Sequence, residues 1–216
     1  IEIGSNDGTF LKNFLKDGNE ILGFEPSKNV ADFAKKNKIP TVNNFFNKST
    51  VKNFKEFLGK TDLICASNVI CHVPNLKDLI ESIDLLLSSD GTFVFEEPYL
   101  GSMFEKVAYD QIYDEHIYIF SASSVSKIFK MFNFELVDVL PQTTHGGSMR
   151  YIIKRENKPI SPKVKTILSY ESENKLDSLD SCIKFKKNCE ISKENILNKI
   201  NFLKKAGKSI CGYAAT

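Results

Sequence analysis

The sequence lacks any C-x-x-C pair, although it contains five cysteines. An odd number of cysteines without that spacing argues against a disulfide framework and against a zinc knuckle within the chain. We therefore expect no metal site here, and the reducing cytoplasm is the default compartment.

The sequence also lacks a signal peptide and any apolar run long enough to cross a bilayer. Its net charge is only +2, and acids are mixed among the lysines that crowd the last third. Without a basic stripe, nucleic acid is not an expected partner, and neither is a membrane. The 216 residues can form one sizeable core and part of a second. Because the sequence opens on Ile1, inside an apolar strand and without Met, it looks like a fragment.

Short apolar strands alternate with helices through the first hundred residues. A helix is predicted from about Thr9, after an opening strand and a glycine-containing loop, and Ser27 and Asn75 are predicted helix N-caps. The further predicted elements are strands Glu20–Phe24, Pro40–Val42, Asp62–Ser67 and Thr92–Glu96, helices from about Lys28, from Ser49 to Leu58 and from Leu76, and a turn at SSDG. This alternation predicts βαβ units and a parallel, doubly wound sheet.

The pattern changes after the fifth strand. Residues 97–120 are predicted to form a long loop, which in a compact domain is usually functional. A helix at about Ser123–Phe132 then leads to strands Phe134–Leu140 and Met149–Lys154, which a short glycine-containing loop joins as an antiparallel hairpin. Five parallel strands ending in a hairpin are the plan of an α/β class I methyltransferase, which is Rossmann-like, rather than of an NAD dehydrogenase. Residues 157–162 are interpreted as a linker to two helical stretches, after which SICGYAAT looks like a strand and glycine turn.

A glycine turn follows the first strand, in the stretch EIGSNDG. Glycines let the backbone approach a ligand, but the spacing is not the dinucleotide fingerprint, and a simple tight turn would explain it. Glu25 ends the second strand, where an acid can accept hydrogen bonds from ribose hydroxyls. Together these features favour an adenosine-type ligand. The predicted cofactor contacts are Glu2, Gly4, Ser5, Asn6, Gly8, Glu25, Pro26 and Asn68.

Three more groups are predicted at the same edge of the sheet. His72 follows the fourth strand; a lone histidine is usually structural, but the carboxyl edge is where such sheets bind ligands. Glu97 ends the fifth strand there. His145 lies in the hairpin loop, where turn geometry alone would justify the neighbouring glycines.

The stretch YDQIYDEHIYIF gathers titratable side chains in a way that no helix or strand periodicity explains. Tyr113, Asp114, Glu115 and His116 are consecutive. Such a cluster is either proton-transfer machinery or a buried polar network that pins a lid. From the residues alone, the two interpretations are equally good.

Several motifs in order carry a resemblance to a known family: EIGSNDGTFL, GFEPS, NVICHVPNL, FEEPYLG, YDQIYDEHIYIFS and THGGSMRY. They resemble the sugar C-methyltransferases of deoxysugar biosynthesis, over essentially the whole chain. These enzymes use S-adenosyl-L-methionine to methylate nucleotide-linked 4-keto-6-deoxyhexoses. The resemblance implies a methyltransferase domain at residues 1–156. It also implies linker helices and the first strand of a truncated C-terminal Rossmann-like domain at residues 157–216. The family's zinc belongs to an N-terminal domain that is absent from this chain, and Ala214 stands where the family tends to have Gly.

The resemblance also implies roles for particular residues. A carbon next to a ketone must lose a proton before it can accept a methyl group, so the enzyme needs a base and a group that stabilises the enolate oxygen. Catalytic roles carry over to Tyr113, Glu115, His116 and His72. We take His116 as the candidate base, although His72 is an open alternative. The predicted contacts to the nucleotide-linked keto-deoxysugar are Glu97, Tyr99, His145 and Arg150.

Two other functions fit the same sequence. One is an O- or N-methyltransferase acting on a small molecule that is already nucleophilic. The other is a non-catalytic protein that binds a nucleotide-sugar and has lost methyl transfer.

Overall fold

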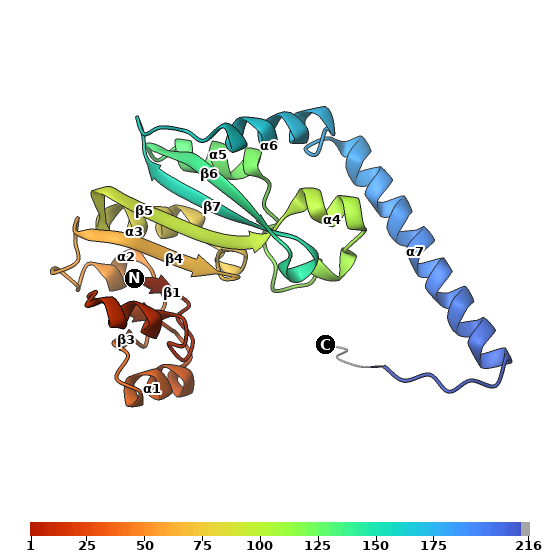
Figure 1. Cartoon of the computed structure of the whole chain (residues 1–216), viewed down its shortest axis with the longest axis horizontal. Helices are drawn as coiled ribbons and strands as arrows, with labels where there is room; N and C mark the ends of the chain where they lie inside the picture. Colours follow the sequence, from red (N-terminus) through yellow and green to blue (C-terminus); the bar gives the residue numbers. More distant parts are fainter. Residues whose placement is uncertain (213–216) are drawn as a thin grey trace.

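Seven strands form one sheet in the order β3-β2-β1-β4-β5-β7-β6 within residues 1–212, the part of the chain that the computed structural model describes (Figure 1). The strands are β1 (Glu2–Ile3), β2 (Gly23–Phe24), β3 (Thr41–Val42), β4 (Thr61–Ser67), β5 (Leu87–Pro98), β6 (Phe134–Gln142) and β7 (Ser148–Arg155). Strand β7 runs antiparallel to both of its neighbours, whereas the other neighbouring pairs are parallel. The predicted doubly wound sheet with an antiparallel terminal hairpin is confirmed.

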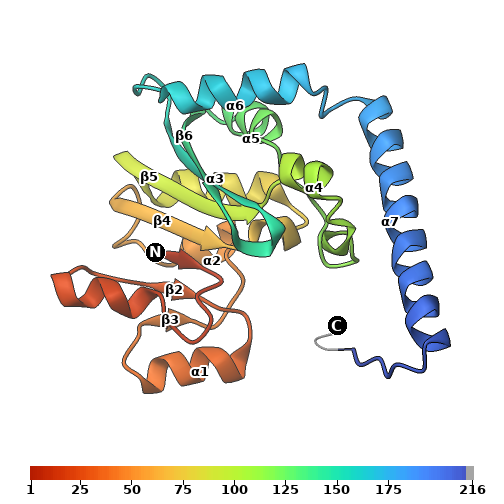
Figure 2. The same ribbon diagram turned by 45° about the vertical axis from the view of Figure 1, so that its right-hand side comes forward.

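Helices pack around the sheet, except for the last one, which stands apart from it. They are α1 (Lys28–Lys36), α2 (Lys48–Val51), α3 (Leu76–Leu86), α4 (Leu100–Lys106), α5 (Ala122–Lys130), α6 (Pro162–Glu173) and α7 (Leu179–Lys205). Helix α6 packs on β6 and α5. Helix α7 stands apart from the sheet in both views (Figures 1 and 2), and near its start Phe185 stacks on Phe104 of α4 with ring centroids 4.8 Å apart. No helix within residues 1–212 is both long and apolar enough to cross a membrane.

The hydrophobic core lies between the sheet and helices α3 and α5. Asn75 caps α3 as predicted, since its side chain accepts a hydrogen bond from the Asp78 backbone N–H. The apolar stripe of this helix is then buried against the sheet, with Ile83 completely inaccessible. Phe95 of β5 stacks on Tyr151 of β7 with ring centroids 4.9 Å apart. Each such side chain contributes roughly 1.5–3 kcal/mol by leaving water, so the central strands form a rigid base for the loops at their ends.

Three local predictions in the first half of the chain are wrong. The helix expected from about Thr9 is a 3₁₀ helix, Leu11–Asp17. Ser27 occupies the N-cap position of α1 without capping it, because its hydroxyl donates to the Asn29 side chain instead. The helix expected at Ser49–Leu58 ends at Val51, and the chain continues in tight turns with hydrogen bonds between residues three apart.

The later corrections concern the two sides of β5 and the C-terminal region. SSDG is part of strand β5 rather than a turn; it lies where the register with β4 shifts, and a Cβ on Gly91 would lie 2.7 Å from the Thr61 carbonyl oxygen. Residues 97–120 contain α4 and a 3₁₀ helix, Tyr109–Gln111, and are therefore no structureless loop. Residues 208–212 form no strand, and the remaining residues of the predicted strand and glycine turn, including Ala214, lie outside the described residues. The domain boundary at residue 157 stays a prediction, and Val164 of α6 belongs to the core of the sheet.

Candidate active site

The glycine turn after β1 fits closely against the loop after β4. Gly4 has a φ of 68°, and a Cβ at this position would lie 2.5 Å from a methyl group of Val69. Its N–H donates to the Phe24 carbonyl at 2.8 Å, which holds the turn at the carboxyl end of β2. Only glycine meets both the left-handed backbone and this close approach without strain.

Polar side chains around this turn have atoms without partners. Among residues 1–212, five buried side-chain atoms lack a hydrogen bond, and three of them are Glu2 Oε2, Ser5 Oγ and Asn68 Oδ1. All three residues are predicted cofactor contacts. A buried polar atom without a partner is costly, so these atoms are suited to a ligand that supplies donors. An ammonium group such as that of the methionine part of S-adenosylmethionine provides them, and the residues therefore fit this cofactor.

Glu25 reaches the glycine turn from the end of β2. One carboxylate oxygen accepts the Asn6 N–H at 3.1 Å and the other accepts the Ser27 N–H at 2.8 Å. Each carboxylate oxygen has a second lone pair free for a donor such as a ribose hydroxyl. Of the other predicted contacts, Gly8 closes the turn with an N–H to the Ser5 carbonyl at 2.9 Å, and Pro26 is exposed beside Glu25.

The loop after β4 is held by a buried carboxylate. One oxygen of Glu97, which is 0% exposed, lies within hydrogen-bond distance of the Val69, Ile70 and Cys71 N–H groups, the shortest distance being 2.6 Å. Burial raises the pKa of this carboxyl above its ordinary value, and the hydrogen bonds partly offset the rise. Sequence reasoning assigned Glu97 to the substrate. The structure places it beneath the loop, because it follows Glu96 on the strand and points to the opposite face. Its second oxygen, Oε2, is buried without a hydrogen-bond partner in the described part of the chain, and the assignment to the substrate stays a prediction.

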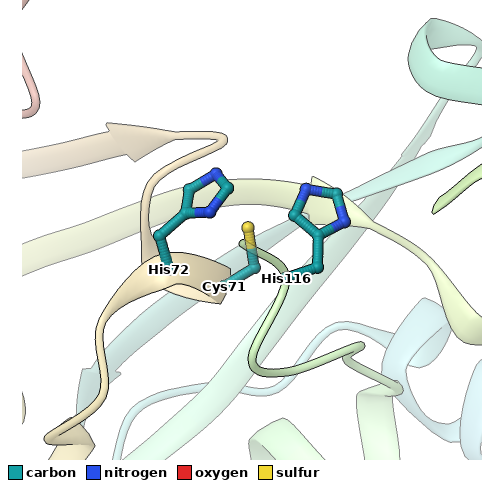
Figure 3. A group of neighbouring side chains, drawn as sticks. All are labelled: Cys71, His72 and His116. Atoms are coloured by element: carbon teal, nitrogen blue, oxygen red, sulfur yellow. The ribbon is translucent and has the colours of Figure 1, made fainter. Parts of the chain in front are cut away.

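His72 and His116 meet where that loop touches the YDEH segment (Figure 3). Their ring centroids lie 5.0 Å apart, and the Cys71 thiol lies between them in the view. The Nδ1 of His72 lies 2.7 Å from the Glu115 carbonyl oxygen, and the Nδ1 of His116 lies 2.8 Å from the Gln111 carbonyl oxygen. Because a carbonyl only accepts, Nδ1 carries the proton in both neutral rings and Nε2 keeps its lone pair.

The phenol of Tyr113 completes the cluster. Its oxygen lies 2.8 Å from His116 Nε2, so in the neutral state the hydroxyl donates to that nitrogen. The ring is 47% exposed, and the Glu115 side chain is exposed as well. The predicted catalytic residues Tyr113, His116 and His72 are thus brought together. Glu115 contributes its backbone carbonyl to His72, and the catalytic role of its side chain stays a prediction.

Cys71 was missed by sequence reasoning, which treated it only as a neighbour of His72. Its sulfur and one nitrogen from each imidazole lie within 4.8 Å of one another, so the three residue types could hold a metal ion. Burial, with the nearby Glu97 carboxylate, raises the pKa of the Cys71 thiol far above its ordinary value. Within this cluster, the Nε2 of His116 already accepts from the Tyr113 hydroxyl, an arrangement suited to proton transfer.

The predicted substrate contacts divide into two groups. Arg150 of β7 forms a two-pronged ion pair with Glu96, with N–O distances of 3.1 and 2.8 Å, and both line a cavity of about 370 Å³ that Glu2 also lines. His145 is exposed in the hairpin loop with a φ of 50°. Tyr99, by contrast, is 5% exposed, and its hydroxyl donates to Glu171 at 3.0 Å. The expectation that it touches a substrate is therefore not supported, because its polar end points into the protein.

Two family models match this chain. Residues 1–139 match a model described as a methyltransferase domain, and residues 143–216 match one described as a C-methyltransferase C-terminal domain.

A curated relative and two solved structures are similar to the chain. The C-methyltransferase NovU of Streptomyces niveus is 25% identical over 217 residues; the match covers 100% of this chain and 52% of the relative, so the chain spans about half of the relative's length. A SAM-dependent methyltransferase from Anabaena variabilis is 18% identical with a TM-score of 0.52, over 72% of this chain and 76% of that one. The plantazolicin methyltransferase BpumL, in complex with a desmethyl analogue and SAH, is 12% identical with a TM-score of 0.51, over 72% and 76% of the two chains. At these identities, the solved structures show the fold alone.

Proposed function

The chain belongs to the methyltransferase-domain family, and from that premise we propose that it serves S-adenosylmethionine-dependent C-methylation next to the ketone of a nucleotide-linked 4-keto-deoxysugar. The observation that carries the proposal is the pair of imidazoles at one edge of the sheet, each with Nδ1 bonded to a carbonyl. Methyl transfer to oxygen or nitrogen does not require abstraction of a proton from carbon, whereas transfer to such a carbon does. The match to a C-methyltransferase C-terminal domain supports the same choice.

The cofactor's contribution is an electrophilic methyl group on a sulfonium ion. Of this chain's residues, Glu25 would accept the ribose hydroxyls, and the unpartnered oxygens of Glu2, Ser5 and Asn68 would accept the ammonium group. The glycine turn brings these groups together, since Gly4 packs against Val69 in the loop that begins at Asn68.

His116 is the proposed base, acting through Nε2. The bond from Nδ1–H to Gln111 fixes the ring and stabilises the positive charge that forms when Nε2 takes a proton. Because the Tyr113 hydroxyl already donates to Nε2, it must turn away before Nε2 can take the proton, and the imidazolium can then donate to the phenol oxygen. An exposed phenol can make that change by turning its hydroxyl.

His72 is the proposed partner of the developing enolate oxygen. In the neutral ring, Nε2 is only an acceptor, so His72 must be an imidazolium to donate to a ketone oxygen. The two ring centroids lie 5.0 Å apart, so a single substrate can meet both side chains. The two histidines are thereby assigned opposite roles: His116 takes the proton from carbon, and His72 donates a hydrogen bond to the enolate oxygen.

Mass spectrometry of the full-length protein tests the function. It is incubated with S-adenosylmethionine and a panel of nucleotide-linked 4-keto sugars, and a gain of one methyl group on carbon is expected. Methylation on oxygen or nitrogen would replace the proposal with the first alternative. Sugar binding without methyl transfer, together with no binding of S-adenosylhomocysteine, would replace it with the second. The sugar, the compartment and any other partner stay predictions from the sequence.

A further inference from the structure

Glu171 of α6 is a buried carboxylate with a large number of partners. It is only 3% exposed. One oxygen accepts the Tyr99 hydroxyl at 3.0 Å and the Ala122 N–H at 2.6 Å, and the other accepts the Ser123 N–H at 2.7 Å as well as the Ser123 hydroxyl. Ala122 and Ser123 are the first residues of α5, where helix N–H groups have no partner within the helix and favour an anion.

These partners lie at the two ends of the segment that bears the proposed base. Tyr99 precedes residues 100–121, Ala122 follows them, and the segment carries His116 and Tyr113. Its ends are adjacent, because Tyr99 forms a bridge with Phe120. The Leu100 N–H also donates to the Phe120 carbonyl at 2.9 Å. One carboxylate therefore closes the loop at its base.

The middle of the segment has a different support. The Ile117 N–H donates to the Cys71 carbonyl at 3.0 Å, and His72 bonds to Glu115. These contacts join the segment to the loop after β4, whereas its two ends are held by the Tyr99–Phe120 bridge and by the carboxylate of Glu171. Within residues 1–212, this carboxylate is the one side chain that bonds to both ends, and it comes from a helix about fifty residues further along the chain, in the region matched by the C-terminal family model.

We infer that Glu171 is a positioning residue for proton transfer: it clamps both ends of residues 100–121, so that helix α6 sets the place of His116. Glu171 touches neither substrate nor cofactor in this role. Its catalytic consequence rests on the proposed function, whereas the clamp itself is a property of the fold.

The test is Glu171→Gln in the full-length protein. The amide has almost the same shape but replaces one acceptor oxygen with an NH₂ group, which cannot accept the hydrogen bonds of α5. Displacement of a catalytic group by about 1 Å can cost about 10²-fold, so kcat should fall by roughly 10- to 100-fold. Affinity for S-adenosylhomocysteine should stay unchanged, because the glycine turn and Glu25 do not contact Glu171.

Two further variants make the comparison specific. Glu173→Gln, an exposed position on the same helix, removes a carboxylate without touching the clamp and should leave kcat unchanged. Tyr99→Phe removes one donor while keeping the buried ring, and should lower kcat in the same direction but less. If Glu171→Gln does not fold, Tyr99→Phe still tests whether the Glu171 clamp positions residues 100–121.

Backbone hydrogen–deuterium exchange, measured without any substrate, tests the clamp independently of the reaction. Exchange at residues 100–121 should accelerate in Glu171→Gln and Tyr99→Phe, with no change at the glycine turn. Unchanged exchange in folded variants would overturn the inference whatever the enzyme methylates. Equal losses of kcat and donor affinity would overturn it as well, since they indicate general destabilisation. If the wild-type protein methylates no keto sugar, the proposed function fails, and the exchange result still decides whether Glu171 holds the segment.

Discussion

The Nδ1 of His72 lies 2.7 Å from the carbonyl oxygen of Glu115, the residue immediately before His116. This bond connects the loop after β4 with the YDEH segment, although His72 and Glu115 are 43 residues apart in the sequence. It also fixes the tautomer of the neutral His72 ring and holds that ring beside His116, with the two planes tilted by 47°. A substitution in one of these loops should therefore shift the position of the histidine in the other. The two rings act as one structural unit.

The first prediction concerns the donor site. Glu25→Ala should weaken binding of S-adenosylhomocysteine by about 10- to 100-fold, since hydrogen bonds to charged groups contribute roughly 1.5–3 kcal/mol. Titration calorimetry measures the change. Glu20→Ala, an exposed acid just before the same strand, is the matched control and should bind like the wild type. Unchanged affinity in Glu25→Ala would remove Glu25 from the site, and binding of NADH instead would contradict the assigned cofactor.

The second prediction concerns the pH dependence of donor binding. Burial raises the pKa of Glu2 to about 7, from an ordinary value of 4.5. Between pH 4.5 and about 7, Glu2 of the folded protein without ligand therefore keeps a proton that it loses in the unfolded chain. The stability contributed by this group is present at acid pH and is lost as the pH rises through about 7.

Burial favours the protonated form of Glu2, whereas an ammonium group bound beside it favours the ionised carboxylate. Donor affinity should then rise as the pH approaches about 7 and level off above it, and binding at about pH 6 should release a proton. Calorimetry in buffers with different ionisation enthalpies counts that proton. Glu2→Gln should abolish both the proton release and the pH dependence. If both persist in Glu2→Gln, another group is responsible.

The third prediction separates a proton-transfer pair from a metal centre. Cys71→Ser keeps the size of the side chain, and its effect on turnover should be small, because the thiol is expected to keep its proton and to bind no metal. Cys189→Ser in α7, far from the cluster in sequence, is the control. If Cys71 were a metal ligand, the substitution should abolish activity and should remove the thiolate-to-metal charge-transfer absorption of a cobalt-loaded protein.

The sheet could be predicted from the sequence because each strand and its helix carry their own periodicity. The cap at Asn75 and the hairpin of β6 and β7 were confirmed because each depends on residues close together in the sequence. The site was harder, because its geometry depends on distant partners. Nothing near Tyr99 indicates that its hydroxyl meets Glu171, 72 residues away. The face to which Glu97 points also depends on the register of β5, which shifts relative to β4 near Gly91.

The last prediction assigns the base. His116→Asn keeps a polar side chain that cannot take a proton at neutral pH, and turnover should fall by about 10²–10⁴-fold, as for a lost general base. Donor affinity should stay nearly unchanged, since His116 lies outside the glycine turn. His72→Asn should cost less if His72 only stabilises the enolate oxygen.

Solvent deuterium exchange at the carbon next to the ketone isolates the proton step, when S-adenosylhomocysteine replaces the donor. Exchange should vanish in His116→Asn and be slowed in His72→Asn. The reverse pattern would make His72 the base, which its Nε2 is equally able to be, because Nδ1 holds the ring proton in both histidines. Exchange that survives both substitutions would exclude both imidazoles. Tyr113, whose hydroxyl contacts His116 Nε2, would then be the next residue to test, together with Glu115.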